Sequence, residues 1–459
     1  MEYAYLLAAL ALTWLPGCVW LSRLVPRGSP GRSCQVSGYG LLLGLMLVPL
    51  VMRGLSAVDI PFSLINIGLP MTMLLAMGLL LPLNWRLDRP DQSFLPPQSS
   101  NNRWQTLVIC ICVSLIFARL VSLGLEVWLR PIFSWDGKQH WAKQAKIFFE
   151  LRSIVPYVPF REWLELGGSD VYTTVHANYP VTVPLLQTWT STALGQWHES
   201  LINLPWVLCY LAMGLIFFGQ SRAAGASSVI ACATTYMLLS MPYLNIQVAL
   251  AGYADIFMSA CYLAAVAAFF NWSNSRAWGQ AILCIIFALC GLLIKNEGVF
   301  WLLSFIPGLI FALLGPKRGI ALITGLSLLL LLALWLLPGD LVIAGQTLNG
   351  LDLQYRPQSW PAIYQSLLVQ DNWHLLGFLF IALSIVAAAR AISSLPRIIP
   401  AAAVVLSALC LFLVLYLLTT YAAGAVSFTS INRVALQLMP AVAFLATLLY
   451  LEITRRRPV

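Results

Sequence analysis

The sequence TLVICICVSLIFARLVSLGLEVWLR, residues 106–130, is apolar and long enough to cross a lipid bilayer as one α-helix, for which about 20 residues suffice. The polar stretch SWDGKQHWAK follows at 134–143 and sets Asp136 between Trp135 and Trp141. A carboxylate at the mouth of a membrane span is costly to place, and such residues usually serve a function. The loop that begins here is therefore the first candidate for a site.

The composition of the whole chain agrees with this span. Of its 459 residues, 60% are hydrophobic and 9% are charged, whereas soluble domains carry about 25% charged residues. Apolar runs of bilayer length recur from end to end, and they lack the alternation of β-barrel strands. We therefore expect an all-α polytopic membrane protein.

The formal net charge of +9 has a simple origin, because basic residues of membrane proteins gather in loops on one side. No basic run is interleaved with stacking aromatic residues, and this argues against nucleic-acid binding. Nine of the ten cysteines fall in apolar runs, and Cys34 lies in a short basic loop. Cys110-x-Cys112 has the wrong spacing for a zinc site. We expect core thiols and no disulfide framework.

The apolar runs predict about thirteen transmembrane helices. They lie near 4–21, 38–52, 61–83, 106–130, 200–219, 226–248, 254–271, 278–294, 298–314, 319–337, 374–389, 398–420 and 434–452. A further apolar helix at 180–195 is counted as re-entrant or interfacial.

The loop charges then fall on alternate sides. One side collects Arg23, Arg27, Arg32, Arg86, Arg89, Arg103, Arg222, Arg276, Lys317, Arg318, Arg390, Arg397 and Arg455–Arg457. By the positive-inside rule this side is the cytoplasm. The prediction is a multi-pass protein of the inner (plasma) membrane with an extracytoplasmic N-terminus and a cytoplasmic C-terminus. If 180–195 crossed, every later basic cluster would lie on the wrong side.

This topology divides the chain into two parts. Residues 1–105 form three additional N-terminal helices and a cytoplasmic loop, and 106–459 form a transmembrane catalytic module. Its loop 131–178 is extracytoplasmic and contains a short interfacial helix with lysines on its polar face. On local sequence alone, Asp136 is equally a helix N-cap.

Four further segments on the extracytoplasmic side carry unusual polar residues. His176 and Tyr179 end the long loop before Pro180 opens the next helix; an interfacial tyrosine and a helix-start proline are the alternative explanation. Asp255 starts a span and is a second carboxylate or a simple cap. Lys295 and Glu297 separate two apolar runs; they neutralise each other or offer a cation to a lipid phosphate.

Arg433 begins the last span on the side that otherwise avoids arginine near span ends. A guanidinium matches a phosphate in two-point contact, and Gln437 lies one helical turn further on the same face.

Together these residues suit sugar transfer from a polyprenyl phosphate. The leaving phosphate needs cations, for which we assign Arg433, Lys295 and Lys138. The acceptor hydroxyl needs a carboxylate base, for which we assign Asp136, with Asp255 as the second catalytic carboxylate. One base and one phosphate clamp imply a single displacement with inversion. The remaining substrate-binding candidates are Trp135, His176, Tyr179, Glu297 and Gln437.

The order of these motifs resembles the GT-C superfamily of membrane glycosyltransferases, which use lipid-phosphate sugars. The matching segments are Trp135-Asp136, His176-x-x-Tyr179-Pro180, Tyr253-Ala254-Asp255, Lys295-Asn296-Glu297 and Asn432-Arg433 with Leu436-Gln437-x-x-Pro440. The last three resemble bacterial members related to the dolichyl-phosphate-mannose-type transferases. The resemblance covers about 106–452 and implies that Asp136 is the catalytic base.

The chain departs from that pattern in its three extra N-terminal spans and in Trp-Asp where metal-using members have an acidic pair. No clear motif supports a divalent metal, and we assign no cofactor. The expected partners are the polyprenyl-phosphate sugar, the bilayer and an acceptor glycan, lipid or protein. The alternative functions are an O-antigen ligase or polymerase, whose long loop lies late in the chain, and a transporter or flippase, which predicts internal repeats and broken helices.

Overall fold

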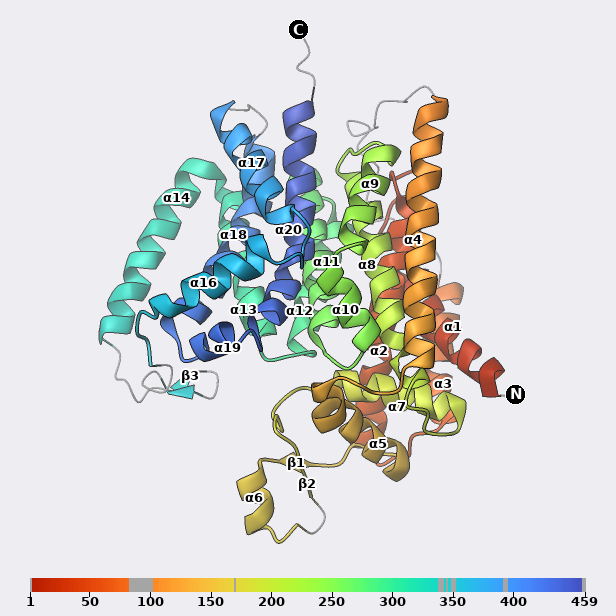
Figure 1. Ribbon diagram of the computed structural model, residues 1–459. Helices are drawn as coiled ribbons and strands as arrows, with labels where there is room; N and C mark the ends of the chain where they lie inside the picture. The colour runs from red at the N-terminus through yellow and green to blue at the C-terminus, as the bar shows by residue number, and fades with distance from the viewer. Residues whose placement is uncertain are drawn as a thin grey trace.

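The computed structural model describes residues 2–81, 102–168, 171–336, 342–343, 346–347, 352–390 and 395–455. Figure 1 shows a bundle of long helices with a smaller group of short elements below it. Strands in the described part are short pairs only, β1 (Tyr157–Val158) with β2 (Tyr172–Thr173) and β3 (Val342–Ile343) with β4 (Gln346–Thr347). The protein is an all-α, multi-pass membrane protein, as the composition predicts.

Eight helical stretches of the described residues are long and apolar enough to cross a membrane. They contain α1 (Glu2–Leu21), α2 (Arg32–Ala57), α4 (Arg103–Leu129), α8 (Leu204–Ala223), α11 (Asp255–Ser275), α13 (Gly298–Leu303) with α14 (Phe305–Leu336), α18 (Leu395–Leu418) and α20 (Ile431–Thr454). A bent pair, α9 (Ser228–Leu239) and α10 (Pro242–Leu250), adds a ninth if it is one span. Shorter apolar helices are α3 (Leu64–Leu80), α12 (Trp278–Leu292) and α17 (Leu376–Ala389).

Each apolar run predicted to cross the membrane contains one of these helices or part of one. The two runs predicted at 298–314 and 319–337 are joined in α14, which has a non-helical Gly315 at φ 73° between them. A positive φ suits glycine because it has no Cβ. The helix therefore changes direction just before Lys317 and Arg318, where the loop charges predict a cytoplasmic turn.

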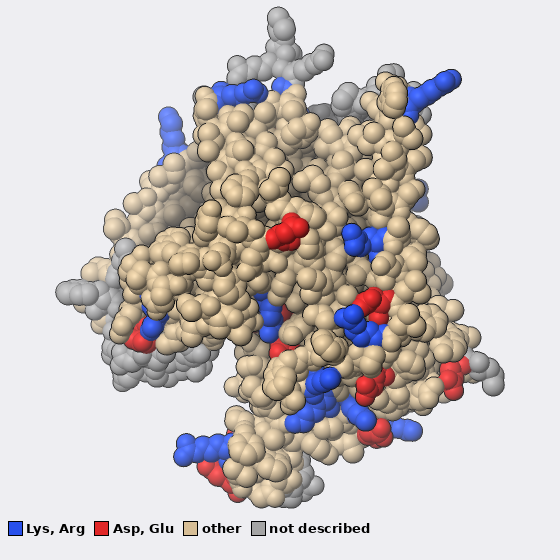
Figure 2. Space-filling model, in the orientation of Figure 1, with Lys and Arg blue, Asp and Glu red and all other residues tan. Residues whose placement is uncertain are grey.

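The ends of the bundle differ in charge. α4 begins and α20 ends at the upper end in Figure 1. On the face drawn in Figure 2, this end shows Lys and Arg without Asp or Glu, while the lower end shows both signs. Arg103 and Arg455 are among the basic residues predicted for one side. Arg86, Arg89, Arg456 and Arg457 of the same group lie outside the described residues.

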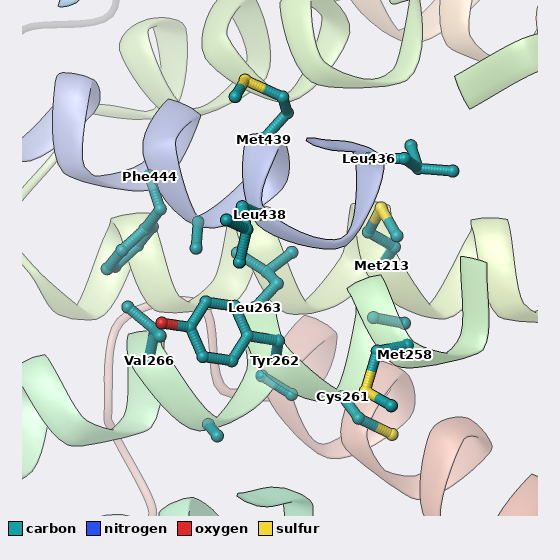
Figure 3. Close-up of a cluster of buried hydrophobic side chains, with 14 of the residues drawn as sticks. Met213, Met258, Cys261, Tyr262, Leu263, Val266, Leu436, Leu438, Met439 and Phe444 are labelled. Atoms are coloured by element: carbon teal, nitrogen blue, oxygen red, sulfur yellow. The ribbon is translucent and has the colours of Figure 1, made fainter. Parts of the chain in front are cut away.

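The core runs along α11 and α20, the two most deeply buried long helices. Figure 3 shows their side chains packed against each other, with Tyr262, Leu263 and Val266 from α11 facing Leu438 and Phe444 from α20. Every residue from Asp255 to Asn271 is buried. Helices that are apolar all round belong in the interior of a bundle, and these two carry the candidate site at their lower ends.

The N-terminal helices pack directly on the rest of the bundle. α2 lies against α8, where Gly38 and Gly219 allow close approach of the two backbones. Small residues at such contacts are typical of membrane helices. A buried polar group also joins them, because Gln220 on α8 donates to Tyr39 of α2 at 2.6 Å and to Gln280 of α12 at 3.0 Å.

The loop between α4 and α8 forms the lower group in Figure 1. It contains a π-helix η2 (Gly137–Trp141), α5 (Ala142–Leu151), α6 (Phe160–Glu165) and α7 (Thr182–Leu194). α7 matches the predicted short helix at 180–195, although it begins two residues after Pro180. Its residues are almost all buried, so protein covers both of its sides.

The structure corrects one expectation about this loop. We expected the apolar face of the helix after Asp136 to lie on lipid. Ala145 and Phe148 of that face are instead fully buried, and α5 packs on α7, whose Thr188 hydroxyl donates to the Ala145 carbonyl at 3.1 Å. Lys143 and Lys146 are exposed on the opposite face. An amphipathic pattern indicates that one face is covered, and here another helix covers it.

Candidate functional site

Five charged side chains from four separate segments form one connected cluster. Asp136 precedes η2, Asp255 starts α11, Lys295 and Glu297 lie in the turn between α12 and α13, and Arg433 lies in the first turn of α20. All five were candidates from sequence. The fold brings them together as a chain of ion pairs that runs from Asp136 through Arg433, Asp255 and Lys295 to Glu297.

Asp255 is the centre of the cluster. Its carboxylate has no exposed surface and accepts three hydrogen bonds, from Lys295 Nζ at 3.0 Å, Arg433 Nε at 2.9 Å and Gln437 Nε2 at 2.6 Å. The N-cap of α11 is Ala254, and the Asp255 side chain is therefore no helix cap. A buried carboxylate needs this degree of pairing, because desolvation of an unpaired charge costs several kcal/mol.

Arg433 joins the two aspartates. While Nε binds Asp255, Nη2 contacts Asp136 Oδ2 at 2.7 Å. The Tyr253 ring lies 4.6 Å from the guanidinium carbon, in the range of a cation–π contact. Gln437 follows one turn later on α20 and binds the same carboxylate, as the helical spacing predicts. Arg433 and Asp136 keep 21% and 24% of their side chains exposed, whereas Lys295 at the other end is 5% exposed beside a Glu297 that is 23% exposed. Arg433 is therefore the more accessible cation of the cluster.

Lys295 forms the other end. Its Nζ contacts Asp255 at 3.0 Å and Glu297 Oε1 at 2.9 Å, and it lies 5.6 Å from the centre of the Tyr179 ring. Burial lowers the pKa of Lys295, but the carboxylates of Asp255 and Glu297 outweigh burial and hold its pKa above the ordinary value. Lys295 is therefore a cation at any physiological pH.

Trp301 supports the cluster from behind and was not among the sequence candidates. Its indole Nε1 donates to Gln437 Oε1 at 2.6 Å. This bond orients the amide so that Gln437 Nε2 faces Asp255. A tryptophan in an apolar helix has no sequence feature that would have distinguished it from ordinary core.

Close backbone packing fixes the position of Asp136. Ser134 Oγ donates to the Ala251 carbonyl at 2.9 Å, next to the turn that leads into α11. A Cβ on Gly252 would lie 2.1 Å from Ser134 Oγ and 3.1 Å from the Gly137 Cα. Only glycine fits there, and its φ of 121° also suits glycine. The Asp136 side chain makes no cap hydrogen bond to η2, so its described partner is Arg433.

Aromatic rings form a wall beside the Lys295 end. Tyr179 stacks on Trp141 with ring centres 5.8 Å apart and on His176 at 4.9 Å. His140 lies 5.9 Å from Tyr179, and its Nδ1 is 2.8 Å from the Thr174 hydroxyl. Burial, with the neighbouring His176 and lysines, lowers the pKa of His140 to about 3. His140 is therefore neutral at neutral pH, and sequence reasoning did not single it out.

Lys138 and Trp135 are further sequence candidates that take no part in the described ion pairs of the cluster. Lys138 is exposed, and its described contact is with the Phe133 ring at 5.9 Å. Trp135 is 71% exposed beside Asp136. Exposure of a large indole next to a charged site leaves it free to stack on a ligand.

The charged residues of the site alternate in sign, and this is not the donor set of a metal centre. Within the described ranges, no group of three or more His, Cys, Asp or Glu residues could hold a metal ion. Each aspartate faces a guanidinium or an ammonium group.

Comparison with protein-family models, with curated proteins and with solved structures found no match to this chain. The assignment of function therefore depends on the chemistry of the site.

Proposed function

We propose that this protein is a membrane glycosyltransferase that resembles the GT-C superfamily. It moves a sugar from a polyprenyl-phosphate donor to an acceptor on the extracytoplasmic face, with inversion. The observation that carries the proposal is the bridge made by Arg433 between the buried Asp255 and the accessible Asp136. The Arg433 guanidinium would bind the donor phosphate, and the Asp136 carboxylate in contact with it would act as the base. The two groups needed for the reaction therefore lie side by side.

The two carboxylates have different roles. Asp255 is fully buried and bound by three donors, so we revise our assignment and propose that it positions Arg433 and Lys295 and takes no proton. Asp136 is partly exposed and has one described partner, and we propose that it is the general base. Different environments give two nearby carboxylates different roles in other enzymes. Here one carboxylate is buried and the other is partly exposed.

In the proposed reaction, the acceptor oxygen forms a bond to the anomeric carbon while the bond from that carbon to the donor phosphate oxygen breaks. Asp136 takes the hydroxyl proton. The bond's electron pair leaves with the polyprenyl phosphate, whose charge Arg433 and Lys295 stabilise. No general acid is needed, since the leaving phosphate is stable as an anion.

We propose thirteen crossings for this topology. The eight long stretches become thirteen crossings if the bent α9–α10 pair counts as one, α3, α12 and α17 cross, and α14 turns back at Gly315. α7 then does not cross. This places all five cluster residues on the extracytoplasmic side, opposite the basic loops.

The transporter alternative is weakened by the hydrogen bonding at the broken span found among the described residues. Transporters use the free carbonyls of broken helices to coordinate ions, and the α9–α10 pair is bent by 58°. Here the Leu239 carbonyl accepts from the Tyr210 hydroxyl at 2.5 Å and from Asn245 at 2.9 Å, and Asn245 also donates to Met241. The described carbonyls at the break are therefore already paired.

The test is transfer in membranes supplied with a labelled polyprenyl-phosphate sugar. Asp136→Asn should lower the transfer rate by about 100-fold or more. Glu165→Gln is the matched control, since it removes an acid from an exposed ion pair with Arg161 in the same loop. Mass spectra of lipids from cells that lack the protein should show accumulated polyprenyl-phosphate sugar, and normal transfer by Asp136→Asn would remove the assignment of the base.

A further inference from the structure

The charge balance of the cluster sets a condition on anion binding. Arg433 and Lys295 face three carboxylates, Asp136, Asp255 and Glu297, so the cluster carries a net charge of minus one when all five are ionised. An anion that simply joined this cluster would be repelled. One carboxylate must therefore leave its cation when a phosphate arrives.

The geometry decides which carboxylate leaves. Asp255 is fully buried and held by three donors. Glu297 is 23% exposed, but the side chain of its cation, Lys295, is only 5% exposed. Asp136 is 24% exposed and holds the cluster by a single described ion pair, to Arg433 Nη2 at 2.7 Å. Both partners of the Asp136–Arg433 pair are partly exposed to solvent, which screens their attraction, so this pair is the weakest in the cluster.

The fork of Arg433 is suited to such an exchange. Its Nε is committed to Asp255 at 2.9 Å, and this bond keeps the guanidinium in place when the other end changes partner. The Nη end faces the partly exposed side where Asp136 lies. A phosphate oxygen and a carboxylate oxygen make similar charge-assisted contacts with this end, and so they compete for it.

From these contacts we infer that Asp136 and the donor's phosphate exchange at Arg433: the phosphate displaces Asp136, and the released carboxylate then serves the acceptor. This rests on the proposed function and adds an order to it. Without donor, Asp136 Oδ2 is in contact with Arg433 and is not free to accept the acceptor's proton. Donor binding releases Asp136. The acceptor hydroxyl is therefore activated only when a sugar is present for transfer to it.

The exchange makes a prediction that a simple base would not make. Loss of the Asp136 charge should strengthen phosphate binding, even though it slows transfer. The probe is farnesyl phosphate, a short polyprenyl phosphate, titrated into the full-length protein in detergent and measured by calorimetry. We expect Asp136→Asn to bind it about three- to tenfold more tightly than wild type, the size expected for removal of a partly exposed ion pair.

Glu297→Gln is the matched control, because it removes the same charge from the same cluster without freeing Arg433. Inorganic phosphate, titrated in parallel, distinguishes a site for free phosphate from one for the lipid-linked group. Asp136→Ala checks that the remaining amide of Asn does not itself hold Arg433. Tighter binding by both Asp136 variants, with a smaller gain for Glu297→Gln, supports the exchange.

Two results would overturn the inference. The first is that wild type binds farnesyl phosphate but the Asp136 variants bind it equally or less tightly, or that Glu297→Gln gains as much affinity as they do. In that case there is no exchange at Arg433, and the proposed function survives. If the folded wild type binds neither farnesyl phosphate nor inorganic phosphate, the donor assignment itself fails and the exchange fails with it. A thermal melt of each variant separates these results from loss of folding.

Discussion

Arg433 donates from Nε to Asp255 at 2.9 Å across 178 positions of sequence, and the same guanidinium holds Asp136 through Nη2. The first bond ends on a fully buried carboxylate and the second on a partly exposed one. One side chain thus has an anchored end and an end that a ligand can reach. This difference is the basis of the predictions on the cluster.

Asp255→Asn should destabilise the protein strongly. The change leaves the buried Lys295 and the partly buried Arg433 beside a neutral amide, and removal of one partner from a buried ion pair costs about 3–5 kcal/mol. Thermal unfolding in detergent measures this loss. Glu165→Gln, in an exposed pair, should change stability by less than about 1 kcal/mol. Equal melting of the two variants would contradict the central role of Asp255.

Arg433→Lys should lose most of the activity while it keeps the charge. A lysine has one ammonium group and lacks the planar fork that binds Asp136 and Asp255 together. Loss of one hydrogen-bond donor to the developing anion typically costs about 100- to 1,000-fold in rate. Rates and donor affinity in the transfer assay check this, and a Lys variant with wild-type kcat would show that charge alone suffices.

Asp136→Asn should lower the transfer rate by about 100- to 10,000-fold, the usual contribution of a general base, and leave the melting temperature within a few degrees of wild type. The carboxylate is partly exposed and has one described partner, so its structural contribution is small. Asp136→Glu keeps a base and should recover part of the rate. A variant that melts early and loses activity in proportion would indicate a structural role instead.

Protein stability should fall with decreasing pH through His140. Its pKa is about 3 in the folded protein against 6.5 for the ordinary group. The unfolded chain therefore binds more protons between these values, and stability is lost as the pH falls from about 6.5 toward 3, by a few kcal/mol in total. Melting curves from pH 7 to pH 4 measure the slope. His140→Gln should flatten it, and an unchanged slope would assign the effect to other groups.

A reporter fused after Arg457 should read cytoplasmic. The prediction follows from the positive-inside rule, because the basic residues Arg455–Arg457 follow α20 in the sequence. Arg455 also pairs with Glu452, three residues earlier. The measurement compares a reporter active only in the cytoplasm with one active only outside it. An extracytoplasmic signal would reverse the sidedness of the whole site, including Asp136 and Arg433.

Much of this protein follows from its sequence alone. Apolar runs of bilayer length predict the helices, because a backbone in lipid must satisfy its own hydrogen bonds. The loop charges predict that Asp136, Asp255, Lys295 and Arg433 lie on one side of the membrane. The spacing from Arg433 to Gln437 put both on one helical face, and both bind Asp255.

Tertiary structure decided the roles within that group. No local pattern distinguishes a buried Asp255 from an accessible Asp136, since burial depends on which helices pack around each residue. The same holds for α5, whose apolar face lies on α7 and not on lipid, and for Trp301 and His140, which look like ordinary core residues in sequence. Pattern and charge determine where a residue can lie along the membrane normal, while its partners come from contacts between segments far apart in the chain.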